Sequence, residues 1–191
     1  MKHIRIATLA AAASVALTFG TVAVAPAFAQ SGTVMVGGAD MYPNKNIIEN
    51  AVNSKDHTTL VAAVKAAGLV DTLSGSGPFT VFAPTNAAFA KLPKGTVDML
   101  LKPENKDKLT KILTYHVVAV SAMSDAIGKM IKDDGGKHTI KTVSGSTLIA
   151  MMKGDKLQLQ DEMGGIATVT IANVKQSNGV IHVVDHVLMP K

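Results

Sequence analysis

Residues Gly77–Phe89 read G-P-F-T-V-F-A-P-T-N-A-A-F, and this stretch indicates how the chain folds. Phe79–Ala83 is a short apolar run of the kind that forms a buried strand. Pro84 ends the strand, because proline has no N–H to donate to a neighbouring strand. Thr85 or Asn86 is then a good N-cap for a helix that begins immediately afterwards. We therefore predict a strand, a forced break and a capped helix, which is a structural unit rather than a catalytic loop.

The N-terminus has the pattern of a secretory signal peptide. A basic start, Met1–Arg5, precedes the uncharged apolar run Ile6–Ala25, and Ala27–Ala29 forms an A-x-A cleavage site. The run approaches the ~20 residues that span a bilayer, so a membrane-anchoring helix is the alternative. Small residues at the cleavage site favour a cleaved signal. We expect cleavage between Ala29 and Gln30, an exported protein that is periplasmic or secreted, and no membrane insertion after cleavage.

Removal of residues 1–29 from the 191-residue chain would leave enough sequence for one domain. We predict a flexible, glycine-containing leader over residues 30–43, for which an edge-strand tail over Gln30–Asp40 is the alternative, and a single domain over residues 44–190. The chain has no cysteine, which excludes disulfides and thiolate metal sites. Its formal net charge is +5, and it has two tyrosines, five phenylalanines and no tryptophan. Nucleic-acid binding needs a clustered basic face with stacking side chains, so we do not expect a nucleic-acid partner.

Apolar residues at helical spacing dominate the first half of the chain, whereas short strand patterns dominate the second half. The predicted helices are Asn44–Val52, 56–67, 95–101, 103–114 and Ser124–Ile131. The predicted strands, after Phe79–Ala83, are Tyr115–Val118, His138–Val143, Thr147–Lys153, Lys156–Gln160, Ile166–Asn173 and Val180–Leu188. Gly154-Asp155 indicates a tight hairpin, and Asp161-Glu162 is predicted to lie in a solvated turn. Such closely spaced strands indicate an antiparallel sandwich rather than a parallel sheet.

Three motifs resemble the signatures of the fasciclin domain. Phe79–Phe89 is similar to the first signature, and Tyr115-His116 is similar to the central Tyr-His motif. Asn178–Asp185, together with Leu188–Pro190, is similar to the second signature. The order and spacing of the motifs resemble those of small, secreted bacterial fasciclins with a single domain. The signature positions are Phe79, Thr80, Val81, Phe82, Ala83, Pro84, Thr85, Asn86, Phe89, Asn178, Gly179, Ile181, His182 and Asp185.

The resemblance implies a fasciclin-type β-sandwich of about seven strands, with several short α-helices packed mainly from the N-terminal half. In animal matrix relatives, the Tyr-His motif and nearby branched aliphatic residues are implicated in integrin-dependent adhesion. The matching candidate interaction or structural motif here is Tyr115, His116, Val117 and Val118. The Asn-Lys-Asp that precedes the second signature in some of those relatives is replaced by Asn173-Val174-Lys175. The integrin role therefore does not carry over, and the resemblance implies only adhesion or binding in general.

The expected function is that of an exported, non-enzymatic protein in cell adhesion, or in recognition of a protein or glycan at the cell envelope, without a cofactor or metal. The alternative is a periplasmic small-ligand or metal-binding module. His182 and His186 are four residues apart, which on a strand is about 13 Å, too far for both rings to bind one ion. Met151 and Met152 are adjacent, so they face opposite sides of a strand and fit core packing better than copper binding.

A third hypothesis is a hydrolase built around His116 and Asp185. Asp185 lies on an apolar face of its predicted strand, where a carboxylate needs hydrogen-bond donors. The donors are either backbone N–H groups, a side chain of the first signature, or His116, which could then serve as the base for a serine. No G-x-S-x-G motif accompanies this pair, so a structural role is favoured. We also predict that His116 is hydrogen-bonded inside the fold, because it lies between an apolar helix and an apolar strand.

Overall fold

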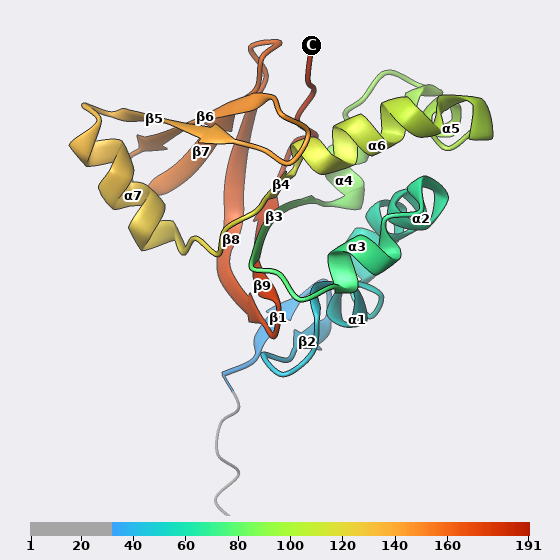
Figure 1. Cartoon of the computed structure of the whole chain (residues 1–191), viewed down its shortest axis with the longest axis horizontal. Helices are drawn as coiled ribbons and strands as arrows, with labels where there is room; N and C mark the ends of the chain where they lie inside the picture. The colour runs from blue at the N-terminus through green and yellow to red at the C-terminus, as the bar shows by residue number, and fades with distance from the viewer. Residues whose placement is uncertain (1–31) are drawn as a thin grey trace, which may run out of the picture.

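A computed structural model describes residues 32–191 of the protein (Figure 1). The predicted signal peptide and its cleavage site at Ala29 and Gln30 lie outside the described residues. These residues form a seven-stranded sheet, a separate two-stranded hairpin and several short helices. The mixed, mainly β architecture that the sequence predicts is confirmed. Between residues 32 and 191, no helix is both long enough and apolar enough to cross a membrane.

The two-stranded hairpin occupies the segment for which a flexible leader is predicted. β1 (Val34–Val36) pairs antiparallel with β2 (Ala39–Met41) across a Gly-Gly turn in which both φ values are positive. The last residue of each strand is buried in the core. This hairpin corrects the prediction of a flexible leader for residues 34–41. Strands of three residues are too short to show an alternating pattern, so the sequence could not decide between a leader and an edge strand here.

The helices begin and end close to the predicted positions. They are α1 (Ile47–Ala51), α2 (Thr58–Ala67), α3 (Val70–Ser74), α4 (Asn86–Ala90), α5 (Thr96–Leu100), α6 (Lys106–Tyr115) and α7 (Ser124–Asp133), with 3-10 turns at Lys55–His57 and Pro103–Asn105. A capping box starts α1, because Asn46 and Glu49 each accept a hydrogen bond from the other's backbone N–H. Gly68 ends α2 with a φ of 72°. In Figure 1, α7 lies on the opposite side of the sheet from α2 and α6.

The sheet has the strand order β4-β3-β9-β8-β7-β6-β5. Its strands are β3 (Phe79–Pro84), β4 (Val117–Val118), β5 (Lys137–Lys141), β6 (Thr147–Lys153), β7 (Lys156–Gln160), β8 (Ile166–Gln176) and β9 (Gly179–Val184). Neighbouring strands are antiparallel except for β3 and β9, which are parallel. The prediction of purely antiparallel pairing is therefore wrong for this one pair. The two strands are far apart in the chain, so the local spacing of strands carries no information about their pairing.

Two predicted strand ends also differ from the structure. β8 continues to Gln176 instead of ending at Asn173, and β9 ends at Val184 instead of Leu188. Asn173 has a φ of 61° at an irregular point of β8, so the alternation stops there although the strand continues. After Val184 the chain leaves the ladder, although Leu188 remains buried.

The seven strands form one continuous sheet that curls until it is nearly a barrel. Two register shifts in the pairing of β8 with β9 mark bulges, which bend a strand and increase its twist. The two edge strands then approach each other, and the Val143 N–H donates to the Val117 carbonyl at 2.8 Å. The curl divides the core in two. One cluster lies between the sheet and the N-terminal elements, and the other lies inside the curl beneath α7.

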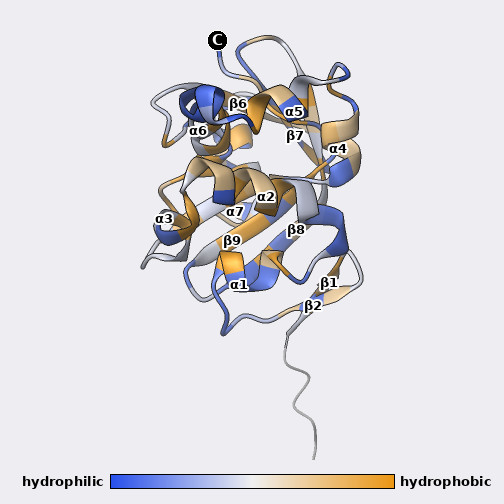
Figure 2. Cartoon of the chain, turned by 90° about the vertical axis from the view of Figure 1, so that its right-hand side faces the viewer, coloured by the Kyte–Doolittle hydropathy of each residue, from blue (hydrophilic) through white to orange (hydrophobic). Residues whose placement is uncertain are grey.

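The inner strand β9 is buried along most of its length. It runs between β3 and β8, and each residue from Val180 to Val184 is buried. Figure 2 shows the strand coloured as hydrophobic over much of its course. His182 is its one polar exception. The first and second signatures are therefore joined at the centre of the molecule, because β3 and β9 are neighbours.

Candidate functional site

The Tyr-His motif is buried at the end of α6. Tyr115 is the last residue of the helix and His116 is its C-cap, with exposures of 0% and 2%. The prediction of a strand over Tyr115–Val118 is correct only for Val117-Val118, because the helical hydrogen bonds continue as far as the His116 N–H, which donates to the Leu113 carbonyl. The motif therefore presents no ring to a partner.

Tyr115 fastens α6 to two other elements. Its hydroxyl donates to the Thr147 carbonyl at 2.7 Å, at the start of β6, and accepts from the Glu162 N–H at 3.1 Å, in the β7–β8 loop. Burial raises the pKa of Tyr115 to about 12, although the hydrogen bond from Glu162 opposes this effect. The phenol is thus a neutral structural link across the nearly closed edge of the sheet.

His116 uses both ring nitrogens inside the fold. Nδ1–H donates to the Ile112 carbonyl at 2.8 Å, and Nε2 accepts from the Leu188 N–H at 3.0 Å, which fixes the tautomer. Burial lowers the pKa of His116 to about 4, and the hydrogen bond to Ile112 does not compensate for it. Neither nitrogen is available to take a proton from a substrate. The geometry does not pair His116 with Asp185, so the proposed hydrolase pair is not assembled.

Asp185 is held by donors of its own. Its Oδ1 accepts from the Thr168 N–H at 2.7 Å and lies 2.9 Å from Nδ1 of His186, while Lys91 Nζ donates to its backbone carbonyl at 2.9 Å. Burial acts to raise the pKa of Asp185, but the hydrogen bonds from His186 and Thr168, together with nearby positive charge, leave it lowered. The carboxylate ties the end of β9 to β8 through a backbone N–H group, which is one of the donors expected from the sequence.

His182, which belongs to the second signature, and His186, which follows Asp185, do not form a metal site. His182 is fully buried and stacks on Phe82 with ring centroids 5.7 Å apart. Its Nε2 bonds to the Ala122 carbonyl at 2.9 Å, and its Nδ1 accepts from the Asn173 N–H at 3.3 Å. His186 lies beyond the end of β9 and pairs with Asp185. Within residues 32–191, no group of three or more His, Cys, Asp or Glu residues is placed to hold a metal ion.

The remaining signature residues hold the backbone together. Thr85 caps α4 by accepting from the Ala88 N–H at 3.2 Å. Asn86 reaches back to α2, where its Oδ1 accepts from the Thr59 N–H at 3.0 Å, so it caps a helix distant in the sequence. The Asn178 side chain accepts from the Ile47 N–H at 3.0 Å and donates to the carbonyls of Leu73, in the last turn of α3, and Gly75, the C-cap of α3. Each of these polar side chains is used for the fold.

One structural residue was missed by the sequence analysis. Asp161 is only 6% exposed, which corrects the prediction of a solvated turn. Its Oδ1 accepts from the Met163 and Gly165 N–H groups, and its Oδ2 accepts from the Met189 N–H at 2.9 Å. An aspartate followed by a glycine-rich turn is a local signal for this arrangement. The link to Met189 has no such signal, because it depends on the path of the C-terminal segment.

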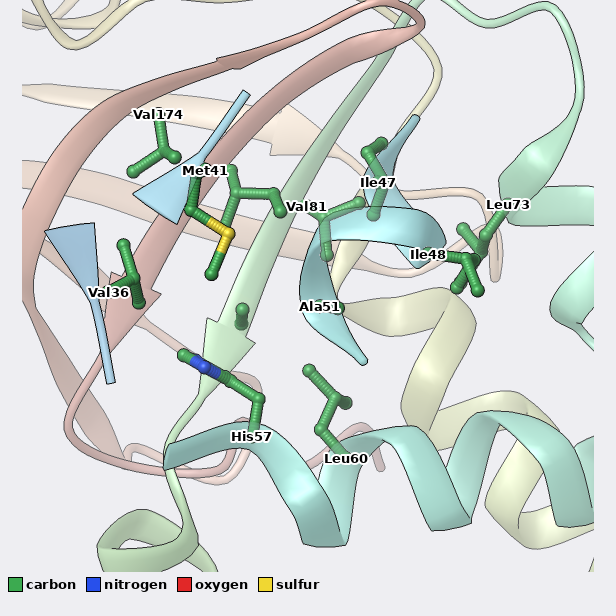
Figure 3. A pocket seen from close by; sticks show the side chains of 12 residues that line it. Val36, Met41, Ile47, Ile48, Ala51, His57, Leu60, Leu73, Val81 and Val174 are labelled. Carbon is green, nitrogen blue, oxygen red and sulfur yellow. The ribbon is translucent and has the colours of Figure 1, made fainter. Parts of the chain in front are cut away.

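A small apolar cavity lies between the sheet and the N-terminal elements (Figure 3). Its volume is about 30 Å³, and it is lined by β1, β2, α1, α2, α3 and the strands β3, β8 and β9. His57 is the polar residue in the lining. Its Nδ1 lies 2.9 Å from the Ser54 hydroxyl, while its Nε2 has no hydrogen-bond partner among the described residues. Burial lowers the pKa of His57. The nearby Ala83 carbonyl acts to raise this pKa, but it does not reach hydrogen-bond geometry with the ring. The cavity is too small for an organic ligand.

A much wider groove runs along α7. Its volume is about 660 Å³, and it separates the polar face of α7 from the surface of β6, β7 and β8. Charged side chains line both of its sides: Asp125, Lys129 and Lys132 from α7, and Asp155 and Lys156 from the β6–β7 turn and β7. Of the residues named from the sequence, Met152 and Asp155 lie in this groove, but neither was assigned a binding role there. The polar residues along one face of α7 are the sequence feature that accompanies this groove. Such a polar face alone does not distinguish a groove from a helix face exposed to solvent.

Comparison with known proteins identifies the family. The model of the fasciclin domain matches residues 55–190. The chain belongs to the fasciclin domain family. Fasciclin domains are of a cell-adhesion type. The matched range contains all three signature motifs and the groove beside α7, whereas the hairpin and α1, which form part of the cavity wall, precede the matched range.

The fasciclin relatives include proteins of similar and of greater length. Protein sll1483 of Synechocystis sp. is 45% identical over 186 residues, which cover 97% of this chain and 96% of that protein. The cell surface glycolipoprotein MPB83 of Mycobacterium bovis is 39% identical over 145 residues, which cover 73% of this chain and 58% of the glycolipoprotein. A FAS1 domain pair from the insect cell adhesion molecule Fasciclin I aligns with a TM-score of 0.46 at 20% identity, covering 74% of this chain and 43% of that chain.

Proposed function

We propose that this fasciclin-domain protein is exported and acts, without enzymatic activity, in adhesion or in recognition of a protein or glycan partner at the cell envelope. The observation that carries the proposal is the internal use of the signature side chains. Tyr115, His116 and His182 are all buried, and each of their polar atoms bonds within the fold. The signatures therefore maintain the domain, and contact with a partner falls to the exposed surface.

The absence of an assembled catalytic centre among the described signature residues supports a non-enzymatic role. A histidine that serves as a general base needs a free nitrogen and a pKa near the working pH. His116 has neither, because both nitrogens are bonded and burial lowers its pKa to about 4. Asp185 is occupied by Thr168 and His186. Fasciclin-domain proteins are generally non-enzymatic, which agrees with this arrangement.

Export is supported by the N-terminal sequence pattern and by the cell-surface location that the name of the MPB83 relative states. Expression of the full chain in a bacterial host, followed by cell fractionation and mass spectrometry of the product, tests this part of the proposal. We expect a product that begins at Gln30 in the periplasm or the medium. A full-length product retained in the cytoplasm would overturn it.

The recognition role is tested by binding of the labelled mature chain to intact bacterial envelopes. We expect saturable binding that unlabelled protein displaces, and that either protease or glycan-stripping treatment of the envelopes removes. An unrelated exported protein of similar size and charge is the control. Binding that does not saturate, or that the control protein matches, would overturn the proposal. Turnover in broad esterase and glycosidase screens would overturn the non-enzymatic part.

A further inference from the structure

The groove beside α7 has the chemistry of a binding site for an anionic molecule. Lys129 and Lys132 project from successive turns of α7, and Lys156 lies across the groove from them on β7. None of the three forms a salt bridge with a residue of the described part of the chain. Three lysine ammonium groups are therefore available around one hollow of about 660 Å³, a size typical of ligand sites.

A glycine in the middle of α7 keeps the groove open. Gly128 lines the groove, and a Cβ added to it would meet no heavy atom within 4 Å. Its φ is not positive, so neither the backbone nor the packing requires glycine there. Glycine in a helix interior is nonetheless less favourable than alanine. A residue that weakens its own helix without a local structural reason indicates a functional one, and here its effect is to leave space in the groove.

The β6–β7 hairpin adds a second unfavourable feature at the same place. Lys153 and Lys156 face each other directly across the two strands, on either side of the Gly154-Asp155 turn. Like charges directly opposite on neighbouring strands repel each other. A bound anion would relieve this repulsion. Lys156, one member of this unfavourable pair, and Gly128 therefore lie on opposite walls of one groove.

The lining also fits one class of anion better than others. Asp125 and Asp155 interrupt the lysines, so a ligand that carries only negative charges meets repulsion as well as attraction. A sugar that carries carboxylate or sulfate groups offers anions to the lysines and hydroxyl donors to the aspartates. The apolar floor of Leu157, Val169 and Ala172 suits the C–H face of a sugar ring. We propose that this groove binds a segment of an acidic polysaccharide.

This inference rests on the proposed recognition function and names the partner class for it. The test measures binding of the purified mature chain to a labelled hexasaccharide of uronic acid by fluorescence polarisation. The neutral hexasaccharide of glucose and hexaglutamate are the comparison ligands. We expect binding to the hexauronate that weakens as salt is raised, with little binding of the neutral sugar. Tighter binding of hexaglutamate than of hexauronate would overturn the polysaccharide assignment in favour of an acidic peptide.

Two charge-matched variants locate the site. One carries Lys129→Gln, Lys132→Gln and Lys156→Gln, and the other carries Lys94→Gln, Lys102→Gln and Lys108→Gln near α5 and α6. We expect the groove variant to bind the hexauronate about tenfold more weakly, because three ion pairs are lost. The second variant, which has the same change in net charge, is expected to bind within about twofold of the native protein. Equal weakening of the two variants would reduce the binding to non-specific attraction and overturn the site.

Filling the groove gives a separate readout. Gly128→Leu adds a side chain where there is space and improves the helix propensity of α7. We expect weaker hexauronate binding with an unchanged or higher melting temperature. Unchanged binding would place the ligand outside the groove and overturn the inference. Saturable envelope binding by native protein that does not bind hexauronate would also overturn the inference, while leaving the proposed recognition function standing.

Discussion

His116 joins the end of α6 to the C-terminal segment through one ring. Replacing it with alanine would leave the Ile112 carbonyl and the Leu188 N–H without partners and would open a cavity in the core. We expect His116→Ala to lower the free energy of unfolding by about 3 kcal/mol, measured by urea denaturation. His186→Ala is the control, because that side chain is 45% exposed, and its effect should be below about 0.5 kcal/mol. An unchanged midpoint for His116→Ala, together with lost envelope binding, would assign His116 to the partner interface.

Three buried histidines make the stability depend on pH. Burial lowers the pKa of His57, His116 and His182, so the folded state keeps them neutral while the unfolded state protonates them near pH 6.5. The unfolded state then binds more protons below that pH, and the free energy of unfolding falls as the pH is lowered. The loss should continue to about pH 4, the pKa of His116, and this residue alone should contribute about 3 kcal/mol.

Urea denaturation in steps between pH 7 and pH 4 measures this dependence. His57→Leu removes one of the three groups and also the unpartnered nitrogen in the cavity. We expect the decline of stability with pH to be shallower in this variant than in the native protein. A variant that shows the same decline would indicate that His57 does not contribute to it.

At the scale of the elements, the parallel pairing of β3 with β9 depends on close approach of the two backbones. A Cβ at Gly179 would collide with the Phe79 carbonyl, so Gly179→Ala must push the strands apart. We expect a loss of more than about 3 kcal/mol or failure to fold, measured by soluble yield and thermal melting. Gly128→Ala in α7 is the matched control, since a Cβ there meets nothing, and it should raise stability by up to about 1 kcal/mol.

Elements that form through local contacts were predicted well. The bounds of β6 and β7 match the prediction because the hairpin between them is set by the Gly154-Asp155 turn. Tyr115 was assigned to a strand because β-branched Val117 and Val118 follow it, whereas packing of the α6 face carries the helix through to Tyr115. The parallel partner of β3 had no local signal at all. The groove beside α7 was missed because its lining comes from a helix and a hairpin that meet only in the folded molecule.

At the scale of the whole molecule, the N-terminal hairpin is part of the folded unit. Val36 and Met41 are 2% and 3% exposed and form part of the wall of the apolar cavity (Figure 3). A chain that begins at Asn44, the predicted start of the domain, would lose both side chains and expose the cavity wall. We expect it to be less stable by about 3–5 kcal/mol than a chain that begins at Gln30, as measured by urea denaturation. Equal stability of the two chains would mean that the hairpin is a dispensable leader after all.

The position of β9 between two other strands of the sheet has a consequence for when the protein folds. The strand ends at Val184, close to the C-terminus, yet it lies between β3 and β8, so neither can complete its pairing until nearly all of the chain is present. Such a high contact order slows folding. A chain delivered N-terminus first to a secretion channel would therefore remain unfolded during its passage and close its sheet only after the last strand has crossed. The topology that makes the native domain compact thus also delays its formation until the last strand of the sheet is available.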